Sequence, residues 1–151
     1  MHHPSRVTIG RRGYKDLRVW QEAFALAELC YDATDVFPRS EMFSLAAQVR
    51  RAAISVPANV AEGAQRRGRG EFIFHVSVAL GSIGELETLI MLARSRDYIP
   101  AEAAEGLLDR CGRVGRMLKQ LERSLVRRRK QERAHMAAPP RGGTRRSRPR
   151  P

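Results

Sequence analysis

The sequence predicts an all-α protein, an antiparallel up-down-up-down four-helix bundle followed by a disordered basic C-terminal tail. Over four long stretches of the 151-residue chain, apolar residues recur at steps of three and four, which is the period of an α-helix. Aromatic residues make up only 6% of the chain, and Ala, Leu and Val are common, which favours helices over sheet. Short connections between such long segments favour antiparallel neighbours.

The first helix is predicted over about residues 16–37. Asp16 is suited to cap its N-terminus, and Pro38 is expected to end it. The second helix is predicted over about residues 40–65. Ser40 is a favourable N-cap there, with an acidic residue directly after it that complements the helix dipole.

The third helix is predicted over about residues 71–96, and the fourth begins at Pro100 and frays near residues 127–130. Gly81 and Gly84 lower the helix propensity of the third segment, and we expect them to admit another helix at close range. The predicted core seams of these two helices are Phe72, Val76, Ala79, Ile83, Leu86, Ile90 and Ala93, then Ala104, Leu107, Cys111, Val114, Leu118, Leu121 and Leu125.

The formal net charge is +12, and residues 127–151, with ten basic side chains and one acidic one, contribute +9 of it. A basic tail is typical of proteins that bind nucleic acid or another polyanion, and a solubilising tail without a partner is the alternative. We predict a bundle over residues 14–133, flanked by disordered segments over residues 1–13 and 134–151.

Composition narrows the class of protein further. Cys30 and Cys111 match no metal-ligand spacing and are interpreted as small buried hydrophobic residues in a reducing compartment. No uninterrupted apolar run approaches the roughly 18 residues of a membrane span, and no signal peptide is visible at the N-terminus. We therefore expect a cytoplasmic protein without membrane association, cofactor or metal.

A polar stripe runs beside the apolar seam of the second helix, and a matching polar line lies on the third helix. An Arg buried in such a stripe needs a carboxylate partner, because an unpaired buried charge is costly. We predict that these side chains pair inside the bundle or between protomers, with a ligand site or a solvated face as alternatives. The predicted structural polar network consists of Arg51, Ser55, Asn59, Glu62, Ser82 and Glu85.

No arrangement typical of catalysis is found, so we predict that the protein is not an enzyme. Glu85 and Glu87 are two residues apart and point in different directions on a helix. His75 has no Ser or Cys nearby in sequence and is interpreted as a hydrogen-bonded helical residue. A di-iron bundle needs Glu-x-x-His on two helices, and the only such spacing joins Glu132 to His135.

Basic residues form a second pattern, because several Arg and Lys side chains recur along one line of the fourth helix. Arginine binds phosphates bidentately, so this line predicts contacts with a nucleic-acid backbone. No aromatic residues alternate with the basic ones, which argues against base stacking. The predicted nucleic-acid-binding residues are Arg66, Arg67, Arg69, Arg94, Arg96, Arg110, Arg113, Arg116, Lys119, Arg123, Arg127 and Lys130. The alternative is pairing with carboxylates on solvated faces, namely Glu102, Glu105, Asp109 and Glu122.

Several spaced motifs occur in a characteristic order at Tyr14–Trp20, Phe37–Phe43, Gln48–Gly63, Glu71–Phe72 and Ala79–Thr88. In these motifs the chain resembles a bacterial four-helix-bundle family first noticed in intervening sequences of 23S ribosomal RNA genes. The accessory variability determinant of diversity-generating retroelements is a relative of that family. The resemblance implies a homopentameric barrel, a basic surface that binds nucleic acid and, in retroelements, a reverse transcriptase partner.

The functional hypothesis is therefore a non-enzymatic accessory protein that binds structured RNA or an RNA–DNA hybrid and assists a reverse transcriptase. The alternative is an oligomeric protein-interaction scaffold with no specific nucleic-acid role.

Overall fold

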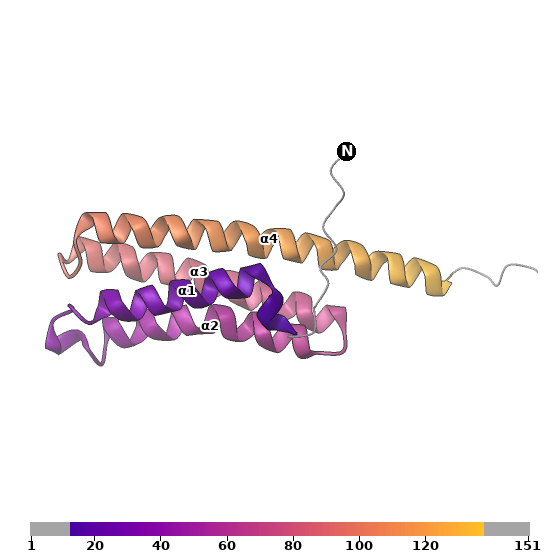
Figure 1. Ribbon diagram of the computed structural model, residues 1–151, viewed down its shortest axis with the longest axis horizontal. Helices are drawn as coiled ribbons and strands as arrows, with labels where there is room; N and C mark the ends of the chain where they lie inside the picture. The colour runs from indigo at the N-terminus through magenta and orange to yellow at the C-terminus, as the bar shows by residue number, and fades with distance from the viewer. Residues whose placement is uncertain (1–12, 138–151) are drawn as a thin grey trace, which may run out of the picture.

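The computed structural model describes residues 13–137, and in this part of the chain nearly all residues are helical (Figure 1). None of the described residues belongs to a β-strand. The elements in order are η1 (Tyr14–Asp16), α1 (Arg18–Thr34), η2 (Arg39–Glu41), α2 (Leu45–Gln65), α3 (Arg69–Ser95) and α4 (Ala101–Ala137). The predicted disorder of residues 1–12 and 138–151 lies outside the described residues.

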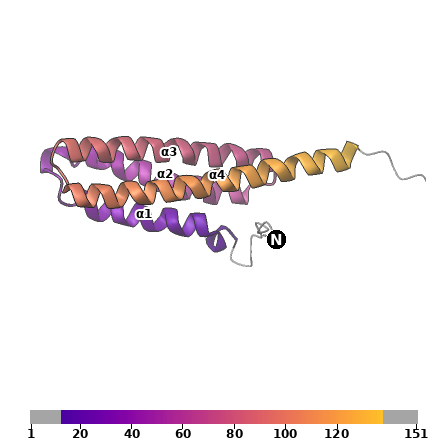
Figure 2. The same ribbon diagram turned by 90° about the horizontal axis from the view of Figure 1, so that it is seen from above.

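The four α-helices pack in a ring in which each one contacts two others. The packed pairs are α1 with α2, α2 with α3, α3 with α4, and α1 with α4, whereas the backbones of the two diagonal pairs stay further apart, with no Cα atoms within 8 Å of each other in the described residues. Figures 1 and 2 show the helices side by side, with consecutive helices running in opposite directions. The predicted antiparallel four-helix bundle is therefore confirmed.

The core of the bundle consists of the apolar seams read from the sequence. Every residue of the two seams predicted for the third and fourth helices is buried. Because both seams repeat at steps of three and four, each helix presents a continuous apolar stripe to its neighbours.

The first helix is shorter than predicted at both ends. Asp16 lies in the 3-10 turn η1, and Leu17 occupies the N-cap position of α1 without a side-chain cap. At the other end, the Thr34 hydroxyl donates to the carbonyl of Cys30 at 2.9 Å and accepts from Nε of Arg50 at 2.8 Å. The Arg50 guanidinium also pairs with Asp35 at 2.9 Å, so the end of α1 is tied to α2.

The second helix begins at Leu45, later than the predicted start at Ser40. The carboxylate of Glu41 accepts the backbone N–H of Leu45 at 3.4 Å and the hydroxyl of Ser44, so this carboxylate caps α2 from the preceding turn. The Tyr98 hydroxyl donates to the other oxygen of Glu41 at 3.2 Å. These hydrogen bonds, the one from Ser44 first, lower the pKa of Glu41.

The fourth helix is longer than predicted, because it continues to Ala137, past the expected boundary at residue 133. Nε of Arg69, at the start of α3, pairs with Glu132 at 2.7 Å. The Arg129 guanidinium lies directly over Gly70, within 3.2 Å of the place where a Cβ would stand. These contacts join α4 to the start of α3, and the last turns of α4 project beyond the other helices (Figure 1).

Candidate functional site

A chain of hydrogen bonds links the polar stripe of α2 to α3. The hydroxyls of Ser55 and Ser82 lie 2.8 Å apart. The amide of Asn59 donates to the carbonyl of Ser55 at 2.9 Å and to its hydroxyl at 3.1 Å. Nδ1 of His75 lies 3.0 Å from Oδ1 of Asn59, and because this oxygen can only accept, the imidazole donates from Nδ1.

The network ends at the surface beside the ion pair of Glu62 and Arg66. Oε1 of Glu62 lies 3.7 Å from Nε2 of His75 and also pairs with Arg66. Two of the predicted members, Arg51 and Glu85, are exposed and make no hydrogen bond or ion pair among the described residues. Each lies beside the contact between α2 and α3, one position further around its helix. The predicted members Arg51 and Glu85 are therefore not part of the network.

His75, which the sequence analysis interpreted as a hydrogen-bonded helical residue, also belongs to this network, and it lies seven residues before Ser82 on the same helical line. Its partner is Asn59 and not a hydroxyl, so no serine in the network has a base to activate it. The arrangement is that of a half-buried structural network. It fixes the register of α2 against α3.

The described residues contain no group of three or more His, Cys, Asp or Glu side chains suited to hold a metal ion. Cys30 and Cys111 are both fully buried, and burial raises the pKa of each thiol to about 12. Protonated thiols in an apolar interior are neither nucleophiles nor metal ligands. Glu132, from the single Glu-x-x-His spacing, pairs with Arg69 instead.

Basic side chains cover the outward face of α4, opposite its buried seam. We call this set the α4 basic row. All of its members are exposed and make no hydrogen bond or ion pair among the described residues. Of the four carboxylates named as alternative partners, Glu105 alone pairs with a predicted basic residue in the described part of the chain, and that residue, Arg94 at 3.4 Å, lies outside the row. The α4 basic row consists of Arg110, Arg113, Arg116, Lys119, Arg123, Arg127 and Lys130.

A shallow hollow of about 440 Å³ lies on the C-terminal part of this face. Val126 forms part of its wall, and three members of the row, Arg123, Arg127 and Lys130, line it. Arg129 and Arg133, two further exposed arginines of α4, were not among the predicted residues.

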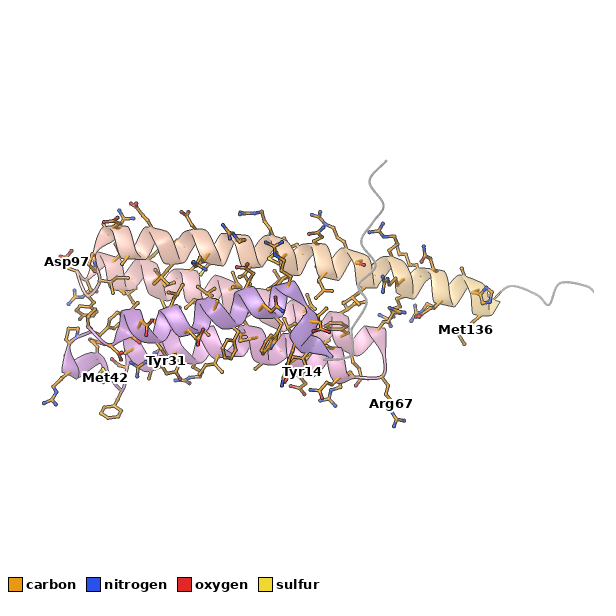
Figure 3. The ribbon with its side chains drawn as sticks, in the orientation of Figure 1. Tyr14, Tyr31, Met42, Arg67, Asp97 and Met136 are labelled. Atoms are coloured by element: carbon orange, nitrogen blue, oxygen red, sulfur yellow. The ribbon has the colours of Figure 1, made fainter. Side chains whose placement is uncertain are left out.

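The other predicted basic residues divide between the two ends of the bundle. Figure 3 shows Arg67 pointing away from the loop between α2 and α3, at the end from which α4 projects. Arg66 and Arg69 lie beside it, but each is paired with a carboxylate. Arg94 and Arg96 lie next to Asp97, at the opposite end of the bundle (Figure 3).

These two ends cannot form one continuous patch, so the candidate nucleic-acid interface is the α4 basic row together with the loop around Arg67. Arg96 instead stacks near the ring of Tyr98, 6.0 Å from its centroid.

Fold and surface together define a small antiparallel four-helix-bundle protein with a basic outward helix. The sequence model of the family described as "23S rRNA-intervening sequence protein" matches residues 15–120. The chain therefore belongs to this family, as the spaced motifs in its sequence indicated.

A solved structure supports the same assignment of fold. It is a protein of unknown function from the S23 ribosomal protein family of Bacteroides thetaiotaomicron, with a TM-score of 0.67 and 23% identity. The likeness covers 72% of this chain and 98% of that one. A comparison with curated proteins gives no match.

Proposed function

We propose that this protein is a non-enzymatic accessory protein that binds the backbone of structured RNA or of an RNA–DNA hybrid. The observation that carries the proposal is the α4 basic row, whose seven side chains are exposed and free of carboxylate partners in the described residues. Unpaired arginines are available for bidentate contacts with phosphate oxygens.

The dimensions of the row suit a nucleic-acid backbone. From Arg110 to Lys130 the helix rises about 30 Å, at about 1.5 Å per residue. Helix α4 contains no aromatic residue, so contacts along the row are to phosphates and sugars and not to stacked bases. Binding of this kind responds to the shape of the nucleic acid and weakens steeply with salt.

The test is fluorescence anisotropy with a structured RNA and an RNA–DNA hybrid over a salt series. The double variant Arg116→Gln/Arg123→Gln removes two charges from the row, and Arg18→Gln/Arg39→Gln removes two exposed charges elsewhere. Each lost phosphate contact makes the slope of log K against log salt shallower by about 0.7 to 0.9. If both double variants change binding equally, the row is not the binding surface and the proposal fails.

A chain ending at Ala137 separates the bundle from the residues that follow it, because it keeps every described helix. If this chain retains the salt-dependent binding, the bundle itself binds. If only the full chain binds, the C-terminal segment is a general polycation and the bundle does not act as proposed.

The reverse transcriptase partner and the homopentamer rest on the family resemblance. Co-purification of a reverse transcriptase encoded beside this protein tests the first, and the mass of the assembly in solution tests the second.

The second candidate function is an oligomeric scaffold for protein interaction. An exposed apolar face on α3, which includes Phe74 and Leu92, favours it. A protein partner that remains bound after nuclease treatment would support this alternative.

A further inference from the structure

The outward side of α1 carries a row of aromatic side chains. Trp20, Phe24 and Tyr31 follow one another at steps of four and seven residues, so they lie on the same side of the helix. The rings of Trp20 and Phe24 lie 5.2 Å apart, and the ring of Tyr14 packs edge-on against Trp20 at 5.3 Å. Phe24 and Tyr31 are 46% and 43% exposed, whereas Trp20 is half-buried. The described part of the chain therefore leaves much of this row uncovered.

Two carboxylates lie beside the row on the same helix. Glu28 follows Phe24 by four residues and Asp32 follows Glu28 by four, and both side chains are exposed without a hydrogen bond or ion pair in the described part of the chain. On the side of α2, the guanidinium of Arg50 lies over the ring of Tyr31, 5.0 Å from its centroid. The row thus already holds one guanidinium by a cation–π contact, and its other rings and carboxylates suit further arginines.

The chain contains an arginine-rich segment directly after α4. Residues 138–151 hold five Arg, four Pro and no acidic residue. The family model ends at residue 120, so this segment lies outside the part of the chain that the family match covers. Its positive charges are complementary to the carboxylates on α1, whereas the α4 basic row repels them.

The length of this segment allows it to reach α1. Fourteen residues of extended chain span at most about 46–50 Å. The 37 residues of α4 rise about 55 Å, so a segment that starts after Ala137 can extend back along most of that helix. The N-terminal half of α1 lies toward the same end of the bundle, as the positions of Tyr14 and Met136 show (Figure 3). The covalent tether gives the segment a local concentration on the order of millimolar, so weak contacts suffice.

We infer that residues 138–151 dock on the aromatic and acidic side of α1 in the same molecule. In the docked state their guanidinium groups stack on the exposed rings and pair with the two carboxylates. This contact withholds the arginines of the segment from a polyanion, whereas the α4 basic row stays free. The inference depends on neither the nucleic-acid binding nor the homo-oligomer proposed above. We call this surface the α1 aromatic face, and it consists of Tyr14, Trp20, Phe24, Glu28, Tyr31 and Asp32.

Other occupants suit the α1 aromatic face less well. Its two carboxylates repel a phosphate backbone. A bilayer would leave the same carboxylates without partners in an apolar medium. A second copy of the chain has to compete with a segment that is attached to the same molecule and held close to the face.

The first experiment uses Trp20, the single tryptophan of the chain, as the probe. Quenching of its fluorescence by acrylamide measures how accessible the α1 aromatic face is. The full chain is compared with a chain ending at Ala137, which keeps every described helix. We expect Trp20 to be protected in the full chain at low salt and to lose this protection in the shorter chain. Protection should also fall at about 1 M salt, where charges are screened beyond about 3 Å. If both chains are quenched equally at low salt, the inference is wrong.

The second experiment removes the carboxylates from the full chain. Glu28→Gln/Asp32→Asn should be quenched like the chain ending at Ala137. The matched control is Glu85→Gln/Asp109→Asn, which removes two exposed carboxylates on α3 and α4 and should keep the protection. Circular dichroism shows that both double variants keep the bundle. If the two double variants are quenched alike, the α1 aromatic face is not where the segment docks.

The third experiment identifies the source of the protection. A peptide with the sequence of residues 138–151, added at about millimolar concentration, should restore protection to the chain ending at Ala137. The same peptide with its five Arg replaced by Gln should not, and equal effects of the two peptides would overturn the role of the guanidinium groups. Protection in the full chain should be the same at every protein concentration. Protection that grows with protein concentration would show that a second copy covers the face, and docking within one molecule would then be wrong.

Discussion

Replacing Gly63 with alanine should destabilise the bundle, although alanine is the better helix former. Gly63 is buried in the last turns of α2, next to α3. A Cβ placed there would lie 2.6 Å from Cδ2 of Phe72 and 2.8 Å from Cβ of His75. The ring of Phe72 is buried, and Cβ of His75 is attached directly to the backbone of α3, so the helices themselves must move apart.

The expected magnitude follows from three contributions. Alanine in place of glycine inside a helix gains roughly 1 kcal/mol of stability. Overpacking a tight contact costs about 1–3 kcal/mol. Displacing His75 also weakens its hydrogen bond to Asn59, which costs about 0.5–1.5 kcal/mol. The net effect of Gly63→Ala is then a loss of about 2 kcal/mol in the free energy of unfolding.

Urea denaturation followed by far-UV circular dichroism measures this loss, at one fixed protein concentration because assembly also contributes to stability. Gly106→Ala is the matched control, since a Cβ there meets nothing within 4 Å. It should gain up to about 1 kcal/mol. If Gly63→Ala is as stable as Gly106→Ala, the close approach of α2 and α3 does not require glycine and the reasoning is refuted.

The remaining predictions concern buried and capping groups. Asn59→Ala removes the amide at the centre of the polar network and should cost about 1–3 kcal/mol in urea denaturation, whereas Gln65→Ala, an exposed amide, should change stability by less than about 0.5 kcal/mol. Cys30 and Cys111, with pKa values raised to about 12, should resist a thiol reagent at neutral pH until the protein is denatured, and fast labelling of the native protein would contradict their burial. The lowered pKa of Glu41 stabilises the fold above its ordinary value of 4.5, and this stabilisation is lost as the pH falls through the lower folded value. Glu41→Gln should therefore lower the unfolding temperature at neutral pH and make the unfolding temperature depend less on pH in the acid range. If the variant shows the same dependence on pH as the wild type, the Glu41 carboxylate does not stabilise the fold in this way.

The helix ends show where local sequence rules gave a wrong answer. Ser40 is a favourable cap by residue type, but α2 begins at Leu45 because the carboxylate of Glu41 reaches its backbone N–H. Helix α4 was expected to fray near residues 127–130. It continues to Ala137, where Arg69 of another helix pairs with Glu132. Contacts of this kind join residues far apart in the chain and leave no local signal.

The sequence predicted a polar network between α2 and α3, but it identified only some of the residues that form it. Ser55, Asn59 and Ser82 lie between α2 and α3, as their spacing suggested, and Glu62 closes the network at the surface. Arg51 and Glu85 share the same helical spacing but lie outside it. A step of three or four residues turns a side chain by up to 60° around a helix, so spacing alone does not fix which residues at the edge of a stripe are covered.

The sequence by itself determined the number and direction of the main helices, their buried seams and the family, because these depend on apolar periodicity and on spaced motifs. It also determined the basic character of α4. Only the tertiary structure decided that the α4 basic row has no carboxylate partner among residues 13–137 and that the basic residues near Arg67 and Arg94 lie at opposite ends. It also decided that α3 has a second apolar face that these residues leave exposed. These properties depend on the rotation and register of packed helices, which are set by contacts between segments distant in the chain.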